Sequence, residues 1–171
     1  MTTVYLIRHS EPDYSFIDDK MSCQWSNLAP LTKKGIDLAK ETKNDPRIQT
    51  GKVLSSPYTR AFQTATILFP DREITIEPML HEWLPDETFQ TPAKEVYLQN
   101  KKYKAALGTH QSKEDTWEEK SKMIKRINDV IEKYKELGEE KIIIVAHERI
   151  INMALDNYQK IPFCGIIEIE K

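Results

Sequence analysis

Glycine and cysteine are both scarce in this chain of 171 residues. The five glycines nowhere form the G-x-G-x-x-G spacing of a dinucleotide-binding turn or the spacing of a P-loop, which excludes both glycine-rich phosphate cradles. The two cysteines, Cys23 and Cys164, are too few for a disulfide scaffold and lack the spacing of metal ligands. Because free thiols are typical of reducing compartments, we expect a cytoplasmic protein.

The sequence also lacks a strong charge of either sign and any long apolar run. Lys and Arg number 25 against 27 Asp and Glu, a net charge of −2, which argues against general nucleic-acid binding. No apolar stretch has the length of a transmembrane helix, and we expect neither a signal peptide nor membrane binding. The length predicts a single domain over residues 1–171 with a sizeable core, and leaves the oligomeric state open.

Short β-type runs alternate with longer runs of helical spacing. The β-type runs predict strands at residues 4–7, 52–55, 74–77, 141–146 and 166–169. With the helical runs between them, the order is β, α, β, α, β, α, α, β, α, β. This order predicts an α/β fold, a three-layer α/β/α sandwich with a mostly parallel sheet. The runs at 4–7 and 141–146 are fully apolar and therefore central, and the last run is expected at an edge.

Capping residues predict where several helices begin and end. Thr32 is the expected N-cap of the first helix. Ser56-Pro57 predicts the start of the second, with Ser at the N-cap and Pro at N1. Thr116 and Glu119 have the spacing of a capping box before the longest helix, which Gly138 should end.

Two segments have little regular pattern. Residues 10–30 are rich in turn formers, and a loop of this length in a compact domain is often functional. Residues 84–115 contain a short expected helix after Thr91-Pro92 and several lysines beyond it. Two interpretations of this second segment remain open: a solvated surface excursion, or an insertion that covers the site as a lid and attracts an anionic group.

Reactive side chains follow four of the predicted strands. In chain order they are Arg8-His9, Ser55-Ser56 with Arg60 one turn later, Glu82 and His147. An isolated Arg-His pair is as compatible with a surface ion pair as with a site. Parallel strands, however, bring their carboxyl ends to one edge of the sheet, where ligands bind in open α/β folds. We therefore expect these groups to converge.

Two kinds of chemistry fit such a set. Two histidines and a carboxylate could hold a divalent metal. Two arginines could instead hold a phosphate dianion through paired hydrogen bonds. Positive charges beside a cation cost binding energy, so the arginines favour phosphate. Arg60 supports this, because a cation in the first turn opposes the helix dipole unless an anion binds there.

The motifs that carry these residues resemble those of the histidine phosphatase superfamily, also called phosphoglycerate-mutase-like. The matching segments, in order, are Arg8-His9-Ser10-Glu11-Pro12, Pro30-Leu31-Thr32-Lys33-Lys34-Gly35, Ser55-Ser56-Pro57-Tyr58-Thr59-Arg60-Ala61-Phe62-Gln63-Thr64-Ala65, Leu80-His81-Glu82 and Val145-Ala146-His147-Glu148-Arg149. The eleven-residue segment at 55–65 is specific by itself.

The resemblance implies a role for each matching residue. His9 is expected to attack phosphorus and become phosphohistidine, and Glu82 to protonate the leaving oxygen and then activate water. The expected phosphate-binding residues are Arg8, Arg60, His147 and Ser15, the last standing where many relatives have Asn. The resemblance therefore implies a histidine acid-type phosphatase, a phosphoric monoester hydrolase that needs no metal or other cofactor and acts on a small phosphorylated molecule or a phosphoprotein.

The chain also departs from the family pattern. Ser10 and Pro12 replace the usual Gly and Thr/Ser after the nucleophile, and Glu148-Arg149 replaces a glycine pair. Glu148 could repel a phosphate, or pair with Arg149 and point away. Two alternatives to hydrolysis therefore stay open: phosphoglycerate-mutase-type transfer, and a degenerate phosphatase that only binds a phosphorylated ligand. The mutases are usually longer near the acid motif, which favours hydrolysis.

Overall fold

The computed structural model describes residues 1–171 and has one five-stranded sheet, ordered β3-β2-β4-β1-β5. The strands are β1 (Thr3–Arg8), β2 (Lys52–Ser55), β3 (Ile74–Ile76), β4 (Lys141–Ala146) and β5 (Ile166–Glu170). The first four are mutually parallel, and β5 pairs antiparallel with β1 at the edge. The predicted α/β fold, the central strands and the edge strand are confirmed.

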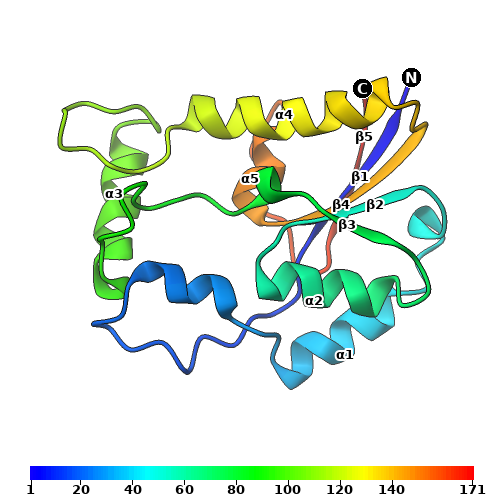
Figure 1. The fold of residues 1–171 in the computed structure, drawn as a ribbon, viewed down its shortest axis with the longest axis horizontal. Coiled ribbons are helices and arrows are strands. Elements are labelled where there is room, and N and C mark those ends of the chain that lie inside the picture. The colour runs from blue at the N-terminus through cyan, green and yellow to red at the C-terminus, as the bar shows by residue number, and fades with distance from the viewer.

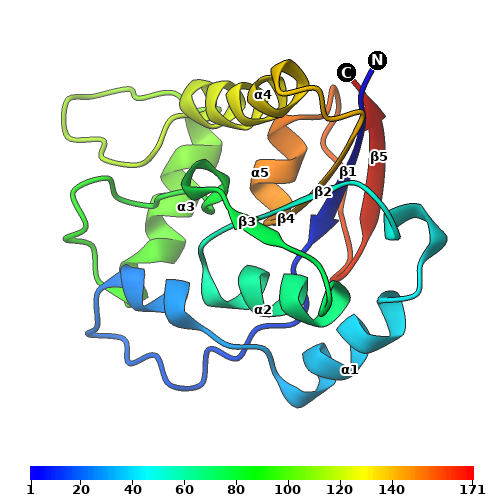
Figure 2. The same cartoon turned by 45° about the vertical axis from the view of Figure 1, so that its right-hand side comes forward.

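Helices cover both faces of the sheet. They are α1 (Lys33–Thr42), α2 (Thr59–Leu68), α3 (Val96–Ala105), α4 (Lys120–Glu136) and α5 (Glu148–Met153). In Figure 1 and Figure 2, α4 and α5 lie on one side of the strands and α1 and α2 on the other. The three predicted layers are therefore present, and α3 lies at the end of the molecule away from both termini (Figure 1).

The two core clusters explain why the central strands are continuously apolar. Val4 and Leu6 of β1 belong to a cluster that includes residues of α4 and α5, whereas Tyr5 and Ile7 belong to one that includes residues of α2. Alternate side chains of a strand point to opposite faces, so a strand covered on both faces needs apolar residues at every position. None of the five α-helices has the length and apolar composition needed to cross a membrane.

Two of the predicted helix ends are confirmed. The Thr32 hydroxyl accepts a hydrogen bond from Gly35 N at 2.9 Å, so Thr32 is the N-cap of α1. Gly138 follows α4 with a φ of 86°, a left-handed conformation that glycine adopts without a side-chain clash. Both ends depend on local chemistry, which the sequence displays.

Two predicted helix starts are wrong. Helix α2 begins at Thr59 rather than after Ser56, and the Ser56 hydroxyl, which accepts from Tyr58 N at 3.3 Å, also contacts His147 Nε2 at 2.8 Å. Helix α4 begins at Lys120 rather than after Thr116, because the Glu119 carboxylate accepts from His110 N at 2.9 Å instead of closing a capping box. In both cases the group that a local cap would use has a partner distant in sequence.

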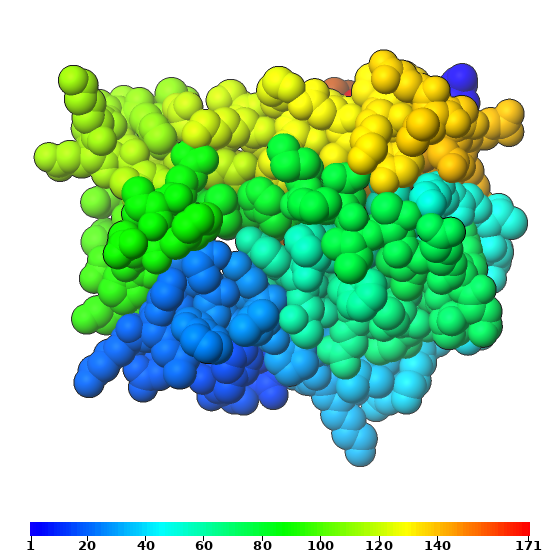
Figure 3. Space-filling model, in the orientation of Figure 1, coloured from blue at the N-terminus to red at the C-terminus, as the bar shows by residue number.

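The two weakly patterned segments lie against each other. The 3₁₀ helix Cys23–Leu28 lies in the first, and the second contains a 3₁₀ turn, Ala93–Glu95, that leads into α3, a longer helix than expected. Cys23 N donates to Thr91 O at 3.1 Å, and Ser22 forms a β-bridge with Pro92. Figure 3 shows the two segments, blue and green, side by side. They form the wall beyond the carboxyl edge of the sheet.

Candidate active site

The imidazole of His9 is held in one protonation state just beyond β1. Its Nδ1 lies 2.7 Å from Ser10 O, and because a carbonyl only accepts, Nδ1 carries the proton and Nε2 the lone pair. Arg60 Nε donates towards that nitrogen at 3.3 Å. Burial and the Arg60 charge lower the pKa of His9 from 6.5 to about 3. The ring is therefore neutral near neutral pH, the form in which a histidine is nucleophilic.

Ser10 anchors this nucleophile to the helices on one face of the sheet. Its hydroxyl donates to Gly35 O at 2.7 Å, and its backbone N–H donates to Thr64 Oγ1 at 3.0 Å. A Cβ on Gly35 would lie 2.4 Å from Glu11 O, so glycine is required there. Ser10, a departure from the family pattern, thus makes a buried hydrogen bond between the nucleophile loop and α1.

Arg60 lies between the nucleophile and the first weakly patterned segment. It is buried in the first turn of α2, and its Nη1 donates to Ser26 O at 2.9 Å. Its guanidinium carbon lies 5.3 Å from the ring centre of Tyr58 and 5.9 Å from that of Tyr14. No carboxylate forms an ion pair with Arg60. Its charge is fixed in place and available to an anion.

Arg8 is fixed from one side only. Its Nη1 lies 2.5 Å from Ile161 O and 2.9 Å from Glu148 Oε2, and its guanidinium carbon lies 4.3 Å from the ring centre of Phe163. Glu148 Oε1 in turn accepts from Ile161 N at 3.0 Å. The Arg8 Nε atom is buried and has no hydrogen-bond partner.

His147 is fully buried at the end of β4, with its ring centre 5.0 Å from that of His9. The Ser56 hydroxyl accepts from Tyr58 N at 3.3 Å and lies 2.8 Å from His147 Nε2. If that hydroxyl donates to Nε2, the proton of the neutral ring is on Nδ1, which is buried and has no partner. Burial, Arg60 and His9 together hold the pKa of His147 well below its usual value.

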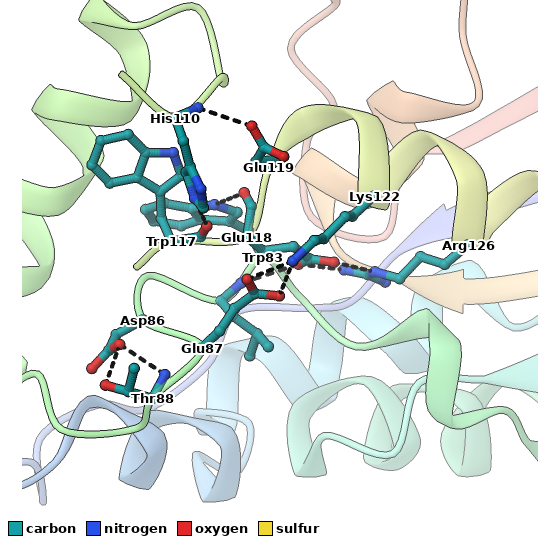
Figure 4. Close-up of polar contacts among 11 residues, drawn as sticks. Trp83, Asp86, Glu87, Thr88, His110, Trp117, Glu118, Glu119, Lys122 and Arg126 are labelled. Carbon is teal, nitrogen blue, oxygen red and sulfur yellow. Dashed lines mark hydrogen bonds and ion pairs between the residues drawn. The ribbon is translucent and has the colours of Figure 1, made fainter. Parts of the chain in front are cut away.

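Glu82 lies on a segment that is tied to α4 on both sides of it. The Glu82 carboxylate accepts from Trp83 N at 2.8 Å. Arg126 and Glu118 form a buried two-contact ion pair at 2.7 and 3.1 Å (Figure 4). Arg126 Nη1 also donates to Met79 O at 2.5 Å. Glu118 accepts from Leu84 N at 3.3 Å through its carboxylate and from Trp83 Nε1 at 3.0 Å through its carbonyl.

Two cavities meet at Arg8, His9 and Glu82, which line both. The smaller, about 280 Å³, extends to Arg60 and the 3₁₀ helix at 23–28. The larger, about 700 Å³, extends to α3 and α5 and is also lined by Lys104, Lys120, Arg149 and Tyr158. A ligand at His9 can therefore extend in two directions.

Most of the predicted site residues come together here. His9, Arg8 and Glu82 share the cavities, Arg60 contacts His9, and His147 lies beside it. Ser15 does not join them, since it is exposed and its N–H donates to Asp13 Oδ1 at 2.9 Å. Of the two alternatives left open for Glu148, pairing with Arg149 is not observed, because Glu148 pairs with Arg8.

Several contacts at the site were not predicted from the sequence. They are the Ser56–His147 hydrogen bond, the stacking of Arg8 on Phe163 and the position of Arg149 in the larger cavity. The partners are separated by many residues along the chain, so no short motif could have indicated them. Only the adjacency of Glu148-Arg149 to His147 marked that pair as worth attention.

The donor set of this site suits an anion. Nowhere do three or more His, Cys, Asp or Glu side chains gather as a group that could hold a metal ion. Four buried side-chain polar atoms lack a hydrogen-bond partner, and three of them are nitrogens of Arg8, His147 and Arg149. Arg8 and Arg149 line the cavities, whereas His147 lines neither. Buried donors are nearly always paired, so the unpaired nitrogens of the two arginines suit an acceptor-rich ligand.

Comparisons with known proteins agree with this geometry. The family model described as the histidine phosphatase superfamily (branch 1) matches residues 4–170. An uncharacterized phosphoglycerate mutase family protein of Acanthamoeba polyphaga mimivirus is 31% identical over 178 residues, covering 94% of this chain and 81% of that protein.

Solved structures share the fold. Phosphoserine phosphatase from Entamoeba histolytica, in complex with 3-phosphoglyceric acid, superimposes with a TM-score of 0.71 at 20% identity, covering 98% of this chain and 90% of that one. Mycobacterial glucosyl-3-phosphoglycerate phosphatase gives a TM-score of 0.73 at 14% identity, covering 99% and 90%.

Proposed function

This chain belongs to the histidine phosphatase superfamily, and from that premise we propose that it hydrolyses phosphomonoesters through a phosphohistidine on His9. The observation that carries the proposal is the state of His9: a neutral ring whose Nδ1–H is fixed on Ser10 O, leaving the Nε2 lone pair beside Arg60. A fixed, neutral imidazole next to cations can attack phosphorus while the cations hold its oxygens.

The reaction then has two steps. In the first, His9 Nε2 forms a bond to phosphorus, the bond from phosphorus to the ester oxygen breaks, and Glu82 gives that oxygen its proton. In the second, Glu82 takes a proton from water as the water oxygen bonds to phosphorus and the P–N bond breaks. Inorganic phosphate leaves, and both residues return to their starting states. Glu82 suits both roles because it lines both cavities with His9.

Three side chains are proposed to hold the phosphoryl oxygens. Arg8 would use its free Nε, Arg60 its guanidinium, and His147 its unpaired Nδ1–H. Fixed donors aimed at oxygens where charge is concentrated lower the barrier without needing to reorganise. A bound dianion would also favour a proton on His147, whose pKa burial and the nearby cations otherwise hold low. None of these steps uses a metal or another cofactor.

The substrate is proposed to be a small phosphorylated molecule. Several structurally similar proteins are described as phosphatases of such compounds, including phosphoserine and glucosyl-3-phosphoglycerate. The cavities at His9 have the volume for a small ester rather than for a protein surface. Hydrolysis is favoured over mutase transfer because the segment after Glu82 is short.

Phosphate release from a panel of small phosphomonoesters and one aryl phosphate tests the proposal. Wild-type protein should release phosphate in the presence of a chelator, and His9→Ala should abolish release. Glu82→Gln should lower kcat by about 10² or more for esters with poor leaving groups, and less for the aryl ester. Absence of release from every compound by folded wild type, or persistent release by His9→Ala, would refute the proposal. Ligand binding without release would favour the degenerate binding module.

A further inference from the structure

The larger cavity holds positive charge that the proposed phosphoryl transfer does not use. Lys104 of α3, Lys120 at the start of α4 and Arg149 of α5 all line it. None of the three forms an ion pair with a carboxylate. Three separate elements thus contribute unpaired cations to a cavity that begins at His9.

Arg149 is the most rigidly held of these cations. Its Nη2 donates to Asn100 Oδ1 at 2.9 Å. Its guanidinium carbon lies 4.1 Å from the ring centre of Trp83 and 5.0 Å from that of Tyr103, so the group stacks on two aromatic faces. Arg149 Nη1 is buried and has no partner. A planar cation fixed in this way has lost its rotational freedom before any ligand arrives.

A purely structural role accounts for only part of this arrangement. As a connection between α5, α3 and Trp83, Arg149 needs its Nη2 bond and its stacking contacts. That role does not explain an unpaired Nη1, because a buried charged donor without an acceptor is destabilising. The nearest carboxylate in sequence, Glu148, is already committed to Arg8 and to Ile161 N. No acceptor within the chain reaches Arg149 Nη1.

We propose that Arg149, with Lys104 and Lys120, forms a second anion subsite that binds a carboxylate or second phosphate on the alcohol part of the substrate. The inference rests on the proposed function, which places the transferred phosphoryl group at His9. The substrate class is then a phosphomonoester whose leaving group is itself negatively charged. Arg8 lines the same cavity, and its ion pair with Glu148 offsets part of its charge there.

A matched pair of substrates tests the subsite. Glycerol 3-phosphate and 3-phosphoglycerate differ in a neutral hydroxymethyl group against a carboxylate. Wild type should prefer the carboxylate by about tenfold or more in kcat/KM, as expected for a charged hydrogen bond. Arg149→Gln should lower this preference about tenfold, mainly through KM, whereas Arg149→Lys should keep part of it. The same kcat/KM comparison between 1,3-propanediol bisphosphate and propyl phosphate tests whether the subsite also accepts a phosphate. A preference for the bisphosphate that Arg149→Gln lowers would show that it does.

The ratio between substrates separates recognition from folding. A merely structural Arg149 would lower turnover of both substrates equally and leave the ratio unchanged. Lys104→Gln and Lys120→Gln should each reduce the ratio about two- to threefold. Lys101→Gln is the matched control, since Lys101 lies on α3, stacks on Tyr97 and does not line the cavity.

Failure of the subsite and failure of the proposed function give different results. Equal kcat/KM for charged and neutral esters, with turnover that depends on His9, would overturn the subsite and leave the hydrolase intact. If no ester is hydrolysed, the binding affinities of the two esters, measured by calorimetry on the folded protein, still test the subsite. Tighter binding of 3-phosphoglycerate than of glycerol 3-phosphate, lost in Arg149→Gln, supports the subsite, and equal binding overturns it.

Discussion

Removing one partner of the Glu118–Arg126 ion pair should destabilise the protein far more than removing both charges. The two residues are 3% and 4% exposed and make two contacts, so each single change leaves a buried charge without its partner. Such a charge costs about 3–5 kcal/mol of unfolding free energy. We therefore expect Glu118→Gln and Arg126→Met each to lose about that much.

The double variant Glu118→Gln/Arg126→Met should lose only about 1–3 kcal/mol of unfolding free energy, the cost of the hydrogen bonds that it removes. Gln keeps an acceptor for Leu84 N, while Met79 O loses its donor. The expected coupling energy is therefore at least about 3 kcal/mol, well above the scatter of independent sites. Urea unfolding of the four proteins at one pH measures it.

The same pair should also affect catalysis, because it holds the segment on both sides of Glu82. Loosening Met79 and Leu84 by about 1 Å would misplace the proposed acid and lower kcat by up to about 10². Additive destabilisation by the two single changes, or an unchanged kcat in both, would refute the reasoning. The exposed pair Lys125–Asp129, also on α4, is the control, since its removal should cost less than about 1 kcal/mol.

Three further changes test the site. Burial lowers the pKa of His9 to about 3, so between pH 6.5 and pH 3 the unfolded state binds more protons than the folded state. The free energy of unfolding should therefore fall by up to about 1.4 kcal/mol per pH unit as the pH falls. Urea unfolding of His9→Gln should show a weaker dependence on pH. Ser56→Ala should lower kcat about tenfold by freeing the neighbouring imidazole, whereas Ser55→Ala, whose hydroxyl bonds a carbonyl, should leave kcat unchanged. Glu148→Gln should tighten inhibition by inorganic phosphate several-fold by removing the charge next to Arg8, and weaker inhibition would contradict this.

The strands along the chain, the two central ones and the edge strand could be predicted because each depends on local composition. A strand covered on both faces must be apolar in its buried part, as residues 142–146 are, and an α/β alternation has few possible topologies. The meeting of His9, Arg60, Glu82 and His147 could be expected for the same reason, since parallel strands share one carboxyl edge.

The remaining features depend on partners that are distant in sequence. Ser56 has the sequence of an N-cap but contacts His147, 91 residues away. Ser15 stands where the family motif has a phosphate-binding residue. Its backbone N–H instead donates to the Asp13 side chain at the surface. Local propensity competes with such tertiary contacts and loses where a buried polar group needs its partner.

Glu148 and Arg149, which stand in place of a glycine pair after His147, have different partners in the structure. Glu148 offsets part of the Arg8 charge and so weakens the attraction for the phosphoryl group common to all phosphomonoesters, while Arg149 adds a cation where the leaving group would lie. A substrate without a charged leaving group makes no contact with Arg149 and loses that part of kcat/KM. Low turnover of a simple aryl phosphate would therefore not by itself indicate a degenerate enzyme. It is expected of a site that selects substrates by the charge of the leaving group rather than by the phosphate alone.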